Sequence, residues 1–182
     1  MDIEISSNKS EYERTIEKFA PRILFFNIKK RTKRKLKHYM KFDNVLLENI
    51  NGVMRKFVHL GLEVGINGKH GEIEYACFYI SEKINTTIMS YNINYVEYNV
   101  NLIDRMFDTK DIATYFENIQ FETFYIKDIL YFVNKEACNN LNAYKLGEGN
   151  YILLDENNEV SGMVLKKITE KELEIINSTE LI

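Results

Sequence analysis

The residues most able to do chemistry in this 182-residue sequence form one basic segment, KKRTKRKLKHYMK, at positions 29–41. It contains eight Lys and Arg residues and no acidic residue: Lys29, Lys30, Arg31, Lys33, Arg34, Lys35, Lys37 and Lys41. Cationic side chains at this density attract phosphates, and each neutralised phosphate releases counterions, so the resulting affinity depends on salt. The segment therefore predicts contact with DNA, with RNA or with an acidic protein surface.

The remainder of the chain is acidic. The whole sequence has 24 basic and 27 acidic residues, a net charge of −3. Without residues 29–41, 16 basic residues stand against 27 acidic ones, a net charge of −11. Such asymmetry concerns partners rather than the fold. Two interpretations stay open: the segment contacts an anionic partner, or it faces Glu and Asp residues of its own chain or of a second copy.

Other chemical motifs are weak. Residues 65–71 (GINGKHG) resemble a phosphate-binding loop only superficially, because the spacing is short and His70 stands where a hydroxyl is needed. No G-x-S-x-G nucleophile elbow occurs, and residues 108–110 (DTK) indicate a helix start rather than a nuclease motif. Metal-ligand spacing is absent among the histidines and cysteines, His38, His59, His70, Cys77 and Cys138. The sequence therefore predicts no catalytic residue, no metal and no cofactor.

Length and composition indicate a single globular domain over residues 1–182, with a weak division, if any, near 104–110. The chain is 45% hydrophobic, which is enough for a core. Its apolar runs are too short to cross a bilayer, and no secretory signal is visible. Two cysteines without CxxC spacing are typical of reduced thiols. We therefore expect a cytoplasmic protein with no membrane partner, and the Asn-, Ile- and Lys-rich composition favours a low-GC bacterium or its phage.

Several segments show helical periodicity. Apolar residues recur at helical spacing over 11–20, 44–60 and 112–119, and the basic segment 29–41 is amphipathic when drawn as a helix. Thr169 and Glu172 form a capping box for a last helix. Residues 121–126 suit a strand, whereas 126–141 suit a helix better.

Other segments alternate as strands do. Residues 22–28 are a compact apolar run, and 62–66 and 73–79 flank an Asn-Gly turn typical of a hairpin. Residues 150–168 predict a second hairpin. Residues 86–102 alternate with a change of phase at Tyr95–Val96, which indicates a bulge. We therefore expect an α+β fold: a mainly antiparallel sheet built from hairpins, with four to five short helices packed on it.

The stretch around 85–101 is rich in Asn and Tyr. Asn is a poor strand residue, whereas Tyr is enriched at protein interfaces. Tyr91, Tyr95 and Tyr98 are therefore a candidate protein-contact face, although a half-exposed strand is the favoured explanation for them.

These observations favour a small binding protein rather than an enzyme. The leading hypothesis is an inhibitor of a nucleic-acid enzyme complex in bacterial or phage conflict, as anti-CRISPR proteins are, acting in the bacterial cytoplasm on a protein or ribonucleoprotein partner. One alternative is a nucleic-acid-binding regulator or processing enzyme that uses 29–41. A second alternative is a toxin-neutralising immunity protein. Self-association is a further expectation to test.

Overall fold

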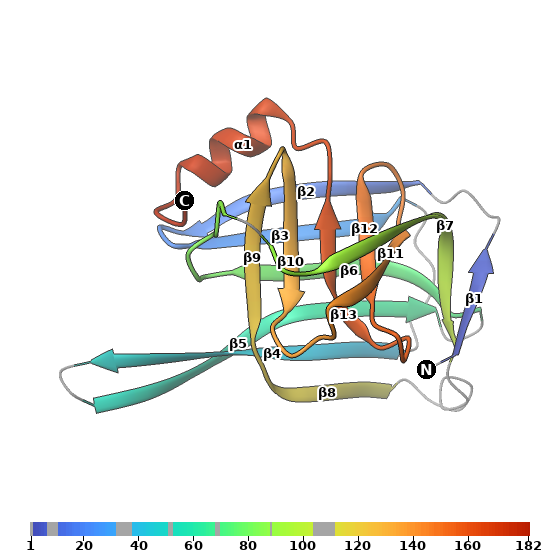
Figure 1. The fold of residues 1–182 in the computed structure, drawn as a ribbon, viewed down its shortest axis with the longest axis horizontal. Coiled ribbons are helices and arrows are strands. Elements are labelled where there is room, and N and C mark those ends of the chain that lie inside the picture. The colour runs from blue at the N-terminus through green and yellow to red at the C-terminus, as the bar shows by residue number, and fades with distance from the viewer. Residues whose placement is uncertain are drawn as a thin grey trace.

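The computed structural model describes residues 2–6, 11–31, 38–50, 53–67, 70–87, 89–103 and 112–182. These residues form thirteen strands and one helix, α1, over Glu170–Asn177 (Figure 1). The strands are β1 (Asp2–Ser6), β2 (Tyr12–Ala20), β3 (Ile23–Lys30), β4 (His38–Ile50), β5 (Val53–Asn67), β6 (Glu72–Ile80), β7 (Asn92–Ile103), β8 (Ile112–Ile119), β9 (Phe121–Ile126), β10 (Ile129–Asn134), β11 (Asn140–Lys145), β12 (Asn150–Leu154) and β13 (Val160–Leu165).

All thirteen strands belong to one curled sheet, whose two halves cross at a steep angle (Figure 1). The first half has the order β2-β3-β6-β5-β4-β8, and the second has the order β9-β10-β13-β12-β11-β7-β1. The halves meet where Glu72 of β6 pairs with Asn101 of β7, and where Gln120 alone separates β8 from β9. Among the described pairings between named strands, only β4–β8 and β7–β11 are parallel. Crossed halves of this kind enclose a core between their inner faces.

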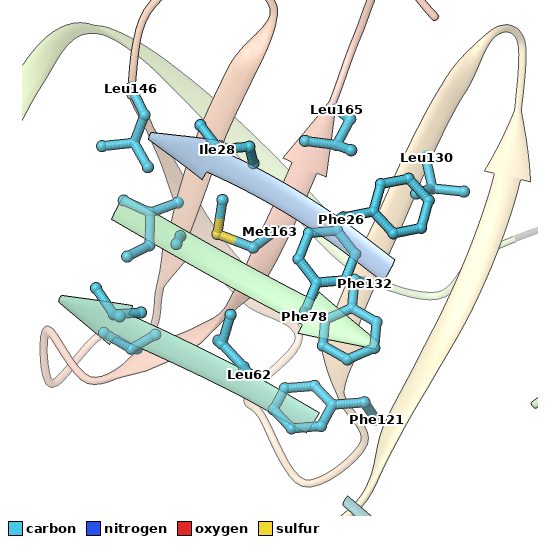
Figure 2. Packing of buried hydrophobic residues seen from close by; sticks show 14 of the residues in the cluster. Phe26, Ile28, Leu62, Phe78, Phe121, Leu130, Phe132, Leu146, Met163 and Leu165 are labelled. Atoms are coloured by element: carbon cyan, nitrogen blue, oxygen red, sulfur yellow. The ribbon is translucent and has the colours of Figure 1, made fainter. Parts of the chain in front are cut away.

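Stacked phenylalanine rings tie the two halves together through that core (Figure 2). Phe26 of β3 stacks on Phe78 of β6 with ring centroids 4.7 Å apart, and Phe78 stacks on Phe132 of β10, also at 4.7 Å. Phe132 in turn stacks on Phe121 of β9 at 4.4 Å. Such aromatic pairs contribute about 0.5–1.5 kcal/mol each beyond the area they bury. The rings therefore fix how the two halves pack.

The two halves differ in how their outer faces are covered. A second apolar cluster, which includes Val133, Leu153 and Val164, lies on the outer side of the second half. Met89, Tyr91, Ile93 and Tyr95 are among the residues that pack against it. In the first half, buried and partly exposed residues alternate regularly, as they do along β3. One face of the first half is therefore accessible to solvent.

The α+β class with four to five helices is wrong, because the described residues are mostly strand and contain one helix. The segments 11–20 and 112–119 are strands β2 and β8, and 126–141 contains β10 rather than a helix. Of the basic segment, Lys29 and Lys30 end β3, and residues from His38 onward begin β4; residues 32–37 lie outside the described part. Cross-strand pairing outweighs helical propensity in these segments, because propensity is a weak prior.

The largest error concerns residues 44–60, where a helix was expected. These residues belong to β4 and β5, which pair up to Ile50 and Val53 and extend beyond the rest of the sheet as a two-stranded ribbon (Figure 1). Their apolar residues recur at helical spacing although they come from two separate strands. The sequence signal against a helix is Asn51-Gly52, a strong hairpin signature; these two residues lie outside the described part.

Several other predictions are confirmed. The strand expected over 22–28 is β3 from Ile23 onward, and β5 and β6 flank the predicted turn, where Gly71 has a positive φ of 68°. β12 and β13 form the hairpin predicted at 150–168, and 121–126 is strand β9. The phase change in β7 is also present, because its register with β11 shifts just after Val96.

The one described helix begins at the predicted capping box. The Thr169 side chain accepts a hydrogen bond from the Glu172 backbone N–H, and the Glu172 carboxylate accepts one from the Thr169 backbone N–H at 2.8 Å. Arg14 of β2 reaches the same carboxylate with a two-point ion pair, Nε to Oε1 at 2.7 Å and Nη2 to Oε2 at 2.8 Å. This ion pair fastens α1 to the edge strand of the first half.

Candidate interaction surface

Four of the eight predicted basic residues lie in the described part of the chain, and each forms an ion pair with a glutamate of the same chain. Lys29 pairs with Glu13 at 2.9 Å, Lys30 with Glu72 at 2.9 Å, Arg31 with Glu11 at 3.0 Å and Lys41 with Glu63 at 3.1 Å. The other four, Lys33, Arg34, Lys35 and Lys37, lie outside the described residues. The interpretation that the segment faces the chain's own acids therefore holds for these four contacts.

The four pairs are not equivalent. The Lys30 side chain is only 7% exposed, and the side chain of its partner Glu72 is 13% exposed. The Arg31 side chain, by contrast, is 63% exposed and that of Glu11 76%. Exposed pairs contribute little to stability and can exchange partners, whereas a buried charge depends on its partner. Lys29 and Arg31 therefore stay available to an external anion, and Lys30 is structural. The Lys41–Glu63 pair, with side chains 30% and 14% exposed, is intermediate.

This difference predicts the outcome of charge neutralisation. Lys30→Gln should lower the free energy of unfolding by about 3 kcal/mol, because Glu72 would be left partly buried without its cation. Arg31→Gln, the matched control, should change it by less than about 0.5 kcal/mol. Urea unfolding followed by circular dichroism measures both values. Equal effects of the two substitutions would contradict this assignment.

The three predicted tyrosines do not form one exposed face. Tyr91 and Tyr95 pack against the second apolar cluster, and the Tyr91 hydroxyl donates to Glu122 Oε1 at 2.7 Å. Tyr98 is 60% exposed. Burial, followed by the hydrogen bond to Glu122, raises the pKa of Tyr91. Only Tyr98 of the three is thus strongly exposed to a partner.

The unusual asparagines of this stretch have a structural role. Asn92 donates to Asn140 Oδ1 at 3.3 Å, and Asn94 donates to Asn142 Oδ1 at 3.0 Å. Both bonds cross the parallel pairing between β7 and β11. Side-chain amides therefore reinforce this pairing, which is the kind that is slightly weaker per residue.

A surface that the sequence did not identify lies on the solvent side of the first half, which we call the outer face. Strand register places its residues in three rows, each crossing neighbouring strands. The first row is Glu17, Phe25 and Tyr79; the second is Thr15, Asn27, Cys77, Glu63 and Lys41; the third is Glu13, Lys29, Tyr75, Gly65 and Tyr39. Successive rows are two residues apart, or about 6.7 Å along the strands.

One end of the outer face is aromatic and apolar. The Tyr79 ring meets the Phe25 ring with centroids 4.8 Å apart and the Phe19 ring edge-to-face at 6.1 Å. Phe19 is 70% exposed, the largest value among the described large apolar side chains. We call Phe19, Phe25 and Tyr79 the aromatic patch. The nearby ion pair of Arg22 with Glu180, at 3.5 Å, gives this end a charged border.

The other end combines tyrosines with cations. The Tyr75 ring lies over Gly65, where any β-carbon would overlap three ring atoms. Tyr39 is paired with Gly65 on the next strand, so both tyrosines adjoin this glycine. Lys29 is the cross-strand partner of Tyr75, and the Lys41 ammonium lies 6.0 Å from the Tyr39 ring centroid. We call Tyr39 and Tyr75 the tyrosine pair.

Burial and the Glu63 carboxylate suppress the ionisation of Tyr75 and Cys77 at this end of the outer face. The Tyr75 hydroxyl donates to Glu63 Oε1, and burial followed by this hydrogen bond raises the pKa of Tyr75. Burial, with the Glu63 charge as a second cause, raises the pKa of Cys77 to about 12. Tyr75 and Cys77 are therefore neutral at physiological pH. They offer binding surface rather than nucleophiles.

Neither a metal centre nor a membrane-spanning helix is found among the described residues. Across those ranges, no three or more His, Cys, Asp or Glu side chains gather as a metal centre would need. No helix in the described ranges has the length and apolar character that crossing a membrane requires.

Comparison with known proteins gives no independent indication of function. No family model matches the chain, and no curated protein matches it.

Proposed function

We propose that this chain is a non-catalytic binding protein whose aromatic patch docks on a macromolecular partner. The observation that carries the proposal is the exposure of Phe19 to 70% on an accessible sheet face, in contact with Tyr79. Leaving an aromatic side chain in water forgoes the free energy that its burial would supply, about 1.5–3 kcal/mol for a Phe. A partner that covers the ring recovers this energy.

The arrangement of the patch resembles that of binding hot spots. Aromatic anchors near the centre of a contact, surrounded by polar and charged residues, carry most of the energy of typical interfaces. Glu17 is the cross-strand neighbour of Phe25, and Arg22 and Glu180 lie at the strand ends. Phe19, Phe25 and Tyr79 would therefore supply affinity, and the surrounding charges would supply orientation.

The proposed biological setting rests on composition and charge. An acidic chain with a single basic segment and an Asn-, Ile- and Lys-rich composition suits an inhibitor of a nucleic-acid enzyme complex in bacterial or phage conflict, located in the cytoplasm of the bacterial host. A protein or ribonucleoprotein is the expected partner. The alternative of a nucleic-acid-binding regulator rests on 29–41, and the immunity-protein alternative rests on no separate structural observation.

The test compares two exposed aromatic residues on different surfaces. Tagged wild-type protein, Phe19→Ser and Tyr98→Ser are used to capture partners from a lysate of the encoding organism, with quantitative mass spectrometry. We expect a protein that wild type and Tyr98→Ser retain equally and that Phe19→Ser loses at least tenfold. Loss with Tyr98→Ser alone would instead favour the face predicted from the sequence. Equal capture by all three would refute the proposal for the patch.

A further inference from the structure

We infer that the tyrosine-pair end of the outer face binds single-stranded nucleic acid. The inference deepens the proposed function, because it assigns the nucleic-acid component of a ribonucleoprotein partner to a second site on the same face. The first observation is the position of the Tyr75 ring. Its ring lies over Gly65, where no β-carbon would fit beneath it, and Tyr75 is only partly buried.

A ring held in this way is a stacking platform. Aromatic side chains on a sheet surface bind unpaired bases because every base has a π-face, and the interaction is tolerant of sequence. Tyr39 is the cross-strand partner of the same glycine from the opposite side. Two partly exposed tyrosines on neighbouring positions can therefore accept two successive bases.

Two lysines adjoin the tyrosine pair. Lys29, with its side chain 44% exposed, is the cross-strand neighbour of Tyr75 on β3, and Lys41, with its side chain 30% exposed, lies two residues after Tyr39 on β4. Lys29 pairs with Glu13, whose side chain is 43% exposed, so a phosphate can compete for this ammonium group. Lys41 pairs with Glu63, whose side chain is 14% exposed, and adds positive charge beside the Tyr39 ring. Ammonium groups beside two rings suit a strand whose phosphates run alongside its stacked bases.

The experiment measures fluorescence anisotropy of labelled twelve-nucleotide oligothymidine and oligouridine with the full chain. Wild type is compared with Tyr39→Leu/Tyr75→Leu and with Tyr39→Phe/Tyr75→Phe. The Leu pair removes stacking, and we expect it to weaken binding about tenfold or more. The Phe pair keeps both rings but loses the Tyr75 bond to Glu63, and we expect it to bind within about twofold of wild type.

Salt dependence separates stacking from charge. Between about 50 mM and about 200 mM salt, wild-type affinity should fall steeply, and Lys29→Gln/Lys41→Gln should reduce the slope of log affinity against log salt by about 1.4. Circular dichroism checks that each variant is folded. No wild-type binding at low salt, or equal binding by the Leu and Phe pairs, would overturn the inference. Partner capture through Phe19 could still succeed then, so failure here is distinguishable from failure of the proposed function.

Discussion

Replacing Arg14 by Met is expected to lower the free energy of unfolding by about 3 kcal/mol, because it leaves a largely buried carboxylate without its cation. The Arg14 side chain is 10% exposed and that of Glu172 is 15% exposed. Besides the two-point ion pair, Arg14 donates to Asn150 Oδ1 at 3.0 Å and to the carbonyls of Lys166 and Lys167, each at 3.1 Å. One side chain thus links β2, the start of β12 and the entry to α1.

A double-mutant cycle identifies the part of this loss that belongs to the ion pair. Chemical denaturation of wild type, Arg14→Met, Glu172→Met and the double variant gives the coupling energy. We expect the double variant to be more stable than the sum of the single losses predicts, because neither charge is then left alone. Additive losses would mean that Arg14 acts only through its bonds to Asn150 and the two carbonyls.

The same pair predicts a pH dependence. Burial alone raises the pKa of Glu172, but hydrogen bonds from Arg14 and Thr169 outweigh burial and hold the pKa below its ordinary value of 4.5. A carboxylate with a lowered pKa stabilises the folded state above its unfolded pKa, and that contribution is lost as pH falls through the folded pKa. The difference in stability between wild type and Arg14→Met should therefore shrink between about pH 6 and about pH 3. A constant difference would exclude the Glu172 charge as its cause.

Gly162→Ala is expected to be the most damaging single methyl addition among the described residues, with a loss of about 4 kcal/mol or more. Gly162 lies in β13 with a positive φ of 146°, and a β-carbon there would overlap the backbone carbonyl oxygen of Phe132. Backbone in this region is strained for any residue with a side chain. Because β10 and β13 are paired at this position, neither strand can move aside without losing its ladder.

Thermal unfolding measures the effect, and Ser161→Ala serves as the neighbouring control. Ser161 is also buried, but its side chain makes one hydrogen bond, to the carbonyl of Glu159 at 3.2 Å. Its replacement should cost about 1 kcal/mol. Equal melting temperatures for Gly162→Ala and Ser161→Ala would mean that the close approach of Gly162 to the Phe132 carbonyl oxygen does not constrain this part of the sheet.

Hairpins could be predicted from the sequence more reliably than helices. Turn chemistry is local, so Asn67-Gly68 and the Thr169–Glu172 capping box were interpreted correctly without knowledge of distant contacts. The helix expected over 44–60 is wrong because apolar positions on two strands repeat at helical spacing, although Asn51-Gly52 is a hairpin signature in the sequence. The strands β2 and β8 are held by pairing with β3 and β4. Such pairing cannot be deduced from either segment alone.

The candidate surface was only partly predictable for the same reason. Concentrated charge at 29–41 is visible in the sequence, but the carboxylates that pair with it come from other strands, as Glu63 and Glu72 do. The outer face depends on strand order: Phe25 and Tyr79 are far apart in the chain and adjacent only because β3 pairs with β6. The alternation of apolar and polar residues in each strand indicates that the strand has one exposed side. It does not indicate which strands lie side by side and so combine their exposed sides into one surface.

The most direct test of the central claim, that the outer face is the partner-binding surface, is photo-crosslinking in cells of the encoding organism. A photoreactive phenylalanine analogue is placed at Thr15, which is exposed in the middle row of the outer face, or at Lys127, which is exposed in the turn between β9 and β10. We predict covalent adducts with a partner macromolecule from position 15 and none from position 127. Adducts from position 127, with none from position 15, would contradict the claim.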